Sequence, residues 1–208
     1  MNRNAPTILV LVLLTATATA FVVTQHLKLE PSPISQTHVD KVFSPACNCA
    51  TRAAHIDFSI RHADHLRIVV RTPSGPAVIA DRTFPKGMVH VEWDGRGAPD
   101  GIYHAVVHMQ RAQRTIDLPN PIRVDTVKPT IALISMSRDG AQTLFRYRTS
   151  EPAHALLFVN GERRIRTYYT VKRGKFAYAG PLTAKTRLVL RARDVAGNLS
   201  RPVKISSL

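Results

Sequence analysis

The residues best suited to chemistry are the two cysteines, Cys47 and Cys49, which are the only ones in the chain. One residue separates them, so a disulfide would close a very short loop and would gain little stability from the entropy of the unfolded chain. Two free thiols, or a metal site that adds His38 or His55, are the alternatives. Zinc takes four ligands in a structural site, and this spacing is not a recognised zinc pattern. We therefore expect a disulfide, with no bound metal and no cofactor.

The histidines are the next candidates, because six of the nine fall between residues 55 and 108. His104 and His108 would lie on the same face of a strand. Four residues at about 3.3 Å each separate them by roughly 13 Å, which is too far for one metal ion. Solvated surface histidines are the simplest interpretation, and a pH-responsive surface is the alternative.

Motifs of common enzymes are absent from the sequence, including G-x-S-x-G, H-E-x-x-H and a glycine-rich phosphate loop. Residues 127–208 contain only four acidic side chains, so a pair of catalytic carboxylates is not expected there. Asp194 lies close to Gly197 and Asn198 and is better explained as a turn residue. We predict a protein that is not an enzyme. A polysaccharide-active enzyme with an unrecognised site is the remaining alternative.

Basic residues are concentrated in the C-terminal part of the chain. The 208 residues carry 29 Lys and Arg against 14 Asp and Glu, a net charge of +15. Residues 1–46 contribute +1, residues 47–126 contribute +2, and residues 127–208, with sixteen basic and four acidic residues, contribute +12. Like charges placed this close repel one another, and an anionic partner would relieve that repulsion. The basic face expected to bind it comprises Arg146, Arg148, Arg163, Arg164, Arg166, Lys172, Arg173, Lys175, Arg187, Arg191 and Arg193.

The N-terminal segment is typical of exported proteins. Residues 5–23 carry no charge and follow Arg3 and the amino terminus. Ala18-Thr19-Ala20 fits a signal cleavage site. Nineteen uncharged residues also suffice to span a bilayer, and the apolar run continues beyond Ala20. We predict a signal peptide or transmembrane anchor over residues 1–23 and favour the anchor, which places the rest of the chain outside the cytoplasm.

The remaining sequence indicates an all-β fold. Residues 24–41 are polar and contain Pro31 and Pro33, which predicts a stalk. Beyond it, apolar residues alternate in short runs that are bounded by Gly, Pro, Asp and Asn. A break near residue 125 separates two such series, and each series fits a sandwich of two sheets. We place the domains at residues 42–126 and 127–208.

Two segments of the first series carry a family resemblance. Residues 93–96 (WDGR) and 99–103 (PDGIY) resemble the W-D-G-R … P-D-G-x-Y signature of FlgD-type Ig-like domains, and residues 43–45 (FSP) resemble their opening. These are β-sandwiches named after the flagellar hook-capping protein. The resemblance covers about residues 42–126. It implies a structural motif of core aromatic and turn residues: Trp93, Asp94, Gly95, Asp100, Gly101 and Tyr103.

The chain departs from that family in two places. The hairpin loop is shorter than the usual form, and the segment with Cys47 and Cys49 replaces the N-G-D-G stretch that often follows F-S-P. A cation site is therefore not implied.

The second series resembles other bacterial Ig-like modules. Residues 125–129 (DTVKP) resemble the D-T-x-x-P joint between tandem modules, and residues 191–198 (RARDVAGN) resemble their A-x-D-x-A-G-N ending. We predict an all-β chain of two tandem Ig-like β-sandwiches that follow an N-terminal apolar helix.

These features predict a non-enzymatic, membrane-tethered extracytoplasmic protein that serves as an adhesion, scaffold or envelope-interaction module. Its expected partners are anionic lipid headgroups, acidic wall or capsule polymers, or extracellular DNA. Specific nucleic-acid recognition is not expected, because aromatic residues are sparse and no base-stacking platform is evident. A solvated arginine-rich surface with no partner is one alternative. A structural accessory of a secretion or surface-appendage assembly is the other, and it rests on analogy of fold.

Overall fold

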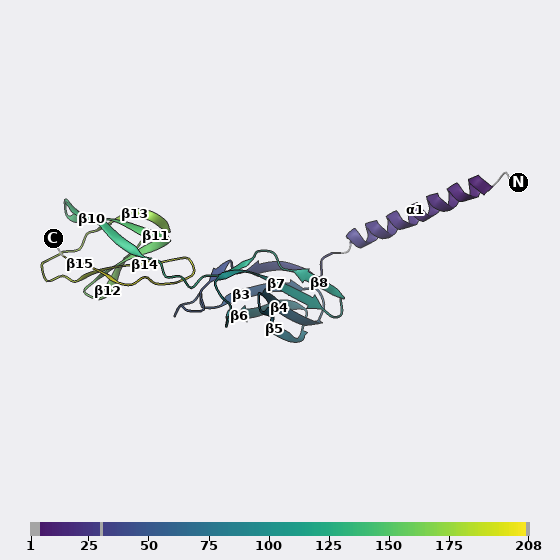
Figure 1. Cartoon of the computed structure of the whole chain (residues 1–208), viewed down its shortest axis with the longest axis horizontal. Coiled ribbons are helices and arrows are strands. Elements are labelled where there is room, and N and C mark those ends of the chain that lie inside the picture. Colours follow the sequence, from purple (N-terminus) through teal and green to yellow (C-terminus); the bar gives the residue numbers. More distant parts are fainter. Residues whose placement is uncertain (1–4, 30, 207–208) are drawn as a thin grey trace.

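The computed structural model describes residues 5–29 and 31–206. In these ranges, helix α1 (Ala5–Leu29) is followed by fifteen strands, which form two β-sandwiches in series (Figure 1). We call residues 34–124 the first module and residues 131–205 the second module. The prediction of tandem Ig-like β-sandwiches after an N-terminal helix is confirmed.

The first module consists of two sheets. One sheet has the order β1-β3-β6, and the other has the order β2-β9-β7-β4-β5 with β8 paired to β7. Apolar side chains at alternate positions of both sheets fill a single core between them. The strands are β1 (Ile34–Val39), β2 (Val42–Phe43), β3 (Ala54–Ile60), β4 (Asp64–Thr72), β5 (Gly75–Phe84), β6 (Gly87–Trp93), β7 (Gly101–Met109), β8 (Arg114–Asp117) and β9 (Ile122–Val124).

An aromatic cluster forms the end of this core that is nearest the second module. Trp93 packs edge-to-face on Phe43 at 5.3 Å and on Tyr103 at 5.1 Å between ring centroids. The hydroxyl of Tyr103 donates a hydrogen bond of 2.5 Å to the carbonyl of Pro99. Gly95 adopts φ +62°, and a Cβ atom there would lie 2.6 Å from the ring of Phe43. The residues that resemble the FlgD-type signature thus pack in the core and turn the chain between strands.

The segment that was predicted as a stalk is largely structured. Helix α1 continues to Leu29, and β1 pairs with β3 as the edge strand of its sheet. The alternating pattern is hidden in β1 because a bulge lies between Ser35 and His38, where Gln36 has φ +52°. As a result the two buried residues, Ile34 and Val39, are five positions apart.

The second module is organised around one long strand, β11. Its first half pairs with β10 and β13, and its second half pairs with β12 and β14, so β11 belongs to both layers of the sandwich. Two buried clusters lie between the layers, one around Tyr147 and Leu190 and one around Phe145 and Leu157. The strands are β10 (Ile131–Asp139), β11 (Gln142–Val159), β12 (Glu162–Arg166), β13 (Val171–Tyr178), β14 (Leu188–Arg193) and β15 (Val203–Ile205).

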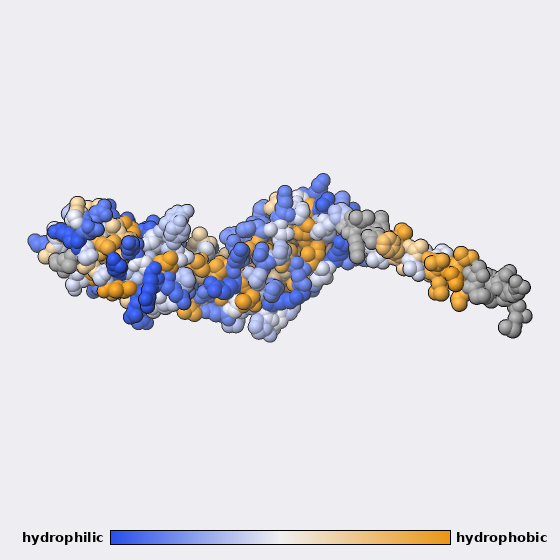
Figure 2. Space-filling model, turned by 90° about the horizontal axis from the view of Figure 1, so that it is seen from above, coloured by the Kyte–Doolittle hydropathy of each residue, from blue (hydrophilic) through white to orange (hydrophobic). Residues whose placement is uncertain are grey.

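Helix α1 lies at the N-terminal end of the row, away from the second module (Figure 1). Its apolar side chains from Leu9 to Leu14 are all more than half exposed. Figure 2 shows orange, hydrophobic surface on the helix. Within the described ranges we find no helix that combines the length and the hydropathy required to cross a membrane. The predicted positive start of the export segment, with Arg3, lies outside the described residues.

Replacing Trp93 by Ala is expected to lower the free energy of unfolding by about 3–5 kcal/mol, because the substitution leaves a cavity between Phe43 and Tyr103. Trp93 is the only tryptophan, so the variant has no tryptophan fluorescence to report unfolding. Unfolding in urea should therefore be followed by circular dichroism. Phe145→Ala provides a matched cavity in the second module. A loss below about 1 kcal/mol for Trp93→Ala would show that the cluster does not support the first module.

Candidate functional site

The two modules meet at a hydrogen-bonded junction between loop 44–51 and turn 194–198. Ser44 Oγ lies 2.6 Å from Asn198 Oδ1, and Thr51 Oγ1 donates to the carbonyl of Ala196 at 2.7 Å. Asn198 Nδ2 also donates to the carbonyl of Asp125, at 2.8 Å, and thereby ties the turn to the linker. Ser44 and Asn198 are buried, so these bonds are shielded from water. The junction therefore holds the modules in a defined relation.

The cysteines lie at this junction. Their sulfur atoms are bonded at 2.10 Å, and the disulfide packs beside Gly197 of the second module. A Cβ atom on Gly197 would lie 2.4 Å from Cys49 Sγ and 2.5 Å from Thr51 Oγ1. Only a glycine fits this turn without displacing the disulfide loop. The short C-x-C loop and the A-G-N turn, which the sequence shows as separate features, thus form one contact.

Three carboxylates converge beside the same turn: Asp125, Glu151 and Asp194. One oxygen of each lies within 4.8 Å of the others, and this is the only such acidic group in the described ranges. Burial raises the pKa of Glu151 above its ordinary value, and the negative charges of Asp194 and Asp125 raise it further. Carboxylates grouped in this way are chemically able to ligate a divalent cation.

Histidines and carboxylates share the outer surface of the first module. His55 Nδ1 lies 2.8 Å from Asp40, and His90 Nδ1 lies 2.9 Å from Asp57. The hydrogen bond with Asp40 raises the pKa of His55. Burial acts to raise the pKa of Asp40, but hydrogen bonds from the backbone and the ring of His55 lower it overall. This pair stabilises the module between the two folded-state pKa values, and its contribution is lost as the pH rises through that of His55.

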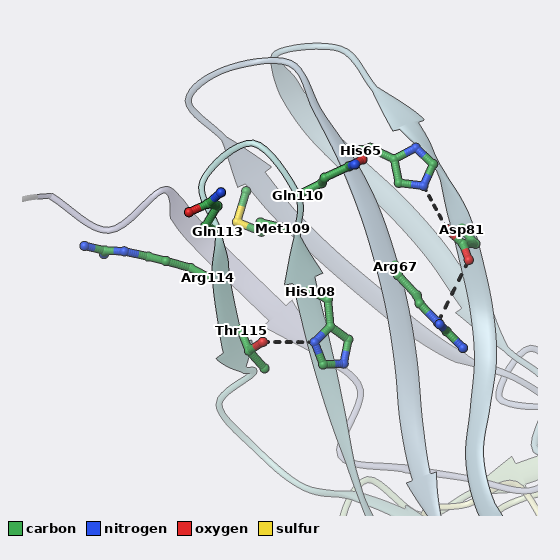
Figure 3. A pocket seen from close by; sticks show the side chains of 9 residues that line it. All are labelled: His65, Arg67, Asp81, His108, Met109, Gln110, Gln113, Arg114 and Thr115. Atoms are coloured by element: carbon green, nitrogen blue, oxygen red, sulfur yellow. Dashed lines mark hydrogen bonds and ion pairs between the residues drawn. The ribbon is translucent and has the colours of Figure 1, made fainter.

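A shallow pocket of about 300 Å³ lies over strands β4, β5, β7 and β8 (Figure 3). In it, His65 Nε2 lies 2.8 Å from Asp81, and His65 Nδ1 lies 3.4 Å from the hydroxyl of Thr83. Asp81, His65 and Thr83 thus place a carboxylate, an imidazole and a hydroxyl in a row. His108 makes a separate contact, at 2.9 Å, with the hydroxyl of Thr115.

A hydrolase would also need donors for an oxyanion. His65 and Thr83 are opposite each other in the β4–β5 ladder. This group of side chains was not foreseen from the sequence, because Asp81 and Thr83 are sixteen and eighteen residues from His65.

The predicted basic residues do not form one face. Four of them lie together on the outer face of the β10–β11–β13 sheet, where Arg146 is directly opposite Lys175 and Arg148 is directly opposite Arg173. All four are exposed, while the intervening Tyr147 is buried. Their neighbours on β10, Ser135 and Ala132, are small. We call this group the basic quartet: Arg146, Arg148, Arg173 and Lys175.

A second basic group lies on the other layer, the β12–β11–β14–β15 face. Leu156 points outward there but is only 2% exposed, because it lies directly between Arg166 and Arg191, whose apolar stems cover it. The guanidinium of Arg191 donates twice to the carbonyl of Ser200, and Arg193 Nε is buried with no hydrogen-bond partner among the described residues. These predicted residues therefore lie on a different layer from the first four, and the guanidinium of Arg191 is already bonded to the backbone.

The other predicted residues lie apart from both groups. Arg163 and Arg164 are in β12, and Arg164 pairs with Glu162 at 2.5 Å. Lys172 lies on β13 beside the basic quartet, and Arg187 precedes β14. Figure 2 shows the most hydrophilic side chains over the second module.

Two exposed tyrosines were overlooked in the sequence. Tyr168 and Tyr169 are 85% and 72% exposed, and their rings meet edge-to-face at 4.7 Å. We call them the tyrosine pair. The sequence feature that indicates this pair is two consecutive tyrosines between the basic segments 163–166 and 172–175. The second module thus carries two exposed aromatic rings beside its basic segments, in an edge-to-face arrangement.

Comparison with known proteins identifies no family. Neither a scan of protein families nor a search of curated proteins gave a match. Solved structures with a similar arrangement include the fibronectin(III)-like modules of CbhA from Clostridium thermocellum, at 15% identity and a TM-score of 0.45 over 82% of this chain and 90% of that one.

Two other solved structures come from an adhesin and from a biofilm-associated protein. A bacterial ice-binding adhesin matches at 15% identity and a TM-score of 0.35, over 86% of this chain and 65% of that one. The BSP domain of a biofilm-associated protein matches at 12% identity and 0.31, over 84% and 30%.

Gly197→Ala is expected to lower the free energy of unfolding by about 1–3 kcal/mol more than Gly161→Ala, through overpacking against the disulfide loop. Gly161 is a matched control, because its φ of +90° is close to the +96° of Gly197 and a Cβ there meets nothing within 4 Å. Urea denaturation measures both. Equal losses of stability in the two variants would mean that the disulfide loop accommodates the added methyl group at no cost in free energy.

Glu151→Gln is expected to stabilise the protein at pH 7. Because the folded-state pKa of Glu151 is raised, ionisation destabilises the fold above that pKa, and the penalty disappears as the pH falls below the ordinary pKa of a glutamate. The gain should therefore shrink between pH 7 and about pH 3.5. Glu162→Gln, on an exposed residue, is the control. A loss of stability at pH 7 would instead indicate a favourable contact of the carboxylate.

Proposed function

We propose that this protein is a non-enzymatic extracytoplasmic adhesion or scaffold module that binds an anionic partner through its second module. The basic quartet supports this most directly. Two pairs of like charges lie directly opposite each other on neighbouring strands, an arrangement that destabilises a sheet. No ion pair involves these four residues among the described parts of the chain.

The second module has almost no carboxylate with which to neutralise the quartet. Of its four acidic residues, Glu162 pairs with Arg164, Glu151 lies in the carboxylate group at the junction, and Asp194 is buried in the turn. Asp139 is at the tip of the β10–β11 hairpin, opposite Gln142. A partner that supplies carboxylates or phosphates would remove the repulsion, and arginine matches such groups with its planar fork.

The first module is proposed to support the second, as a FlgD-type Ig-like domain. The packing of Phe43, Trp93 and Tyr103 is consistent with that resemblance. The exposed apolar surface of α1 is consistent with an export segment, retained or removed, because such a surface is unfavourable in water. The junction would then keep the quartet at a fixed orientation on the far module.

Replacing the quartet with glutamine is expected to weaken binding of the full-length chain to immobilised inorganic polyphosphate by about fourfold or more, since each of the four exposed ionic contacts contributes about 0.2–1 kcal/mol. The dependence of binding on salt should also become less steep.

The matched control removes four exposed charges elsewhere in the second module, by changing Arg163, Lys185, Arg201 and Lys204 to Gln. Because the net charge falls by the same amount, an equal loss of binding in both variants would refute a specific site on the β10–β11–β13 face.

A further inference from the structure

We infer that the ligand of the second module is an acidic polysaccharide built of uronic acids, held jointly by the basic quartet and the tyrosine pair. This inference rests on the proposed function and names the chemical class of the partner. The quartet would engage carboxylates, and Tyr168 and Tyr169 would pack against sugar rings, whose C–H faces are apolar.

The tyrosine pair is presented on a fixed loop. Thr167, immediately before it, is bound to β11 by its backbone N–H to the carbonyl of Ala155 at 3.0 Å and by its hydroxyl, which accepts from the Ala155 N–H at 2.9 Å. The Thr167 carbonyl also lies 2.8 Å from His154 Nδ1. On the other side, Val171 pairs with Ala153. With both ends of the loop bonded to one strand, little conformational entropy is lost when a ligand binds the rings.

The loop that carries the tyrosine pair leads directly into β13, the strand that carries Arg173 and Lys175. Tyr169 and Arg173 are four residues apart, which limits the distance between their Cα atoms to roughly 13 Å in an extended chain. Within the quartet, the Cβ atoms of opposite residues are about 5 Å apart across the strands, and residues two positions apart are about 6.6 Å apart along each strand. A linear polymer with regularly spaced carboxylates can therefore contact several cations and a ring at the same time.

The geometry favours sugar rings over nucleic-acid bases. The two tyrosine rings are inclined at 85°, so they cannot both lie flat against consecutive parallel bases. Successive sugar rings of a polysaccharide are rotated about the chain axis and can meet two differently oriented surfaces. A lipid surface would favour several large apolar side chains beside the cations, but the partners of the arginines on β10 are Ser135 and Ala132, and Ile134 is the one exposed large apolar side chain of that strand.

The test uses the full-length chain and three probes of similar charge: polygalacturonate, inorganic polyphosphate and a single-stranded oligodeoxynucleotide. Tyr168→Ala together with Tyr169→Ala should weaken binding to polygalacturonate by about tenfold, as expected when one stacking contact is lost. The same variant should bind polyphosphate, which has no rings, as tightly as the unaltered chain. Tyr168→Phe with Tyr169→Phe keeps the rings and should retain most of the affinity for polygalacturonate.

The outcomes separate this inference from the function on which it rests. Full binding of polygalacturonate by the double alanine variant would overturn the role of the tyrosine pair. Tighter binding of the oligonucleotide than of polygalacturonate, with the same dependence on the tyrosines, would overturn the polysaccharide in favour of nucleic acid. Unchanged binding of polyphosphate by the glutamine quartet variant would instead refute the proposed function. Circular dichroism of each variant identifies any loss of fold.

Discussion

The second module depends on the passage of β11 from one layer of the sandwich to the other. Between its two paired halves, the hydroxyl oxygen of Thr149 lies 2.6 Å from the carbonyl of Glu151 and 2.9 Å from that of Val171, and its single hydrogen is shared between them. Thr149 thereby holds the bend and fixes the start of β13 against it. The bend is internal to one strand. The single strand β11 therefore positions both layers of the sandwich, and with them the junction and the tyrosine loop.

This passage also determines what the cations do. Before the bend, Arg146 and Arg148 point away from the core beside the cations of β13, and their partners on β10 are Ser135 and Ala132. After the bend, the outward positions of β11 are His154, Leu156 and Phe158, and Arg191, opposite Leu156, bonds the carbonyl of Ser200. Arginine residues of similar appearance in the sequence thus have different surroundings.

Periodicity was sufficient to predict the fold class, because most strands alternate buried and exposed residues in the simplest way. It failed for β1, where the bulge at Gln36 shifts the pattern by one residue. It also could not divide the basic residues between two faces, since the crossing of β11 leaves its alternation intact. The junction was represented in the sequence only by two separate resemblances, at residues 125–129 and 191–198. Neither indicated that Gly197 packs on the disulfide.

The central claim is that an acidic polymer binds the β10–β11–β13 face next to the tyrosine loop. Its most direct test is a titration of the isotopically labelled full-length chain with polygalacturonate, followed by the NMR shifts of backbone amides. The account predicts that the largest shifts occur in residues 144–149 and 168–176, with small shifts along β14 and in the first module. Shifts centred on β12, β14 and β15, or on the histidine-rich surface of the first module, would contradict it.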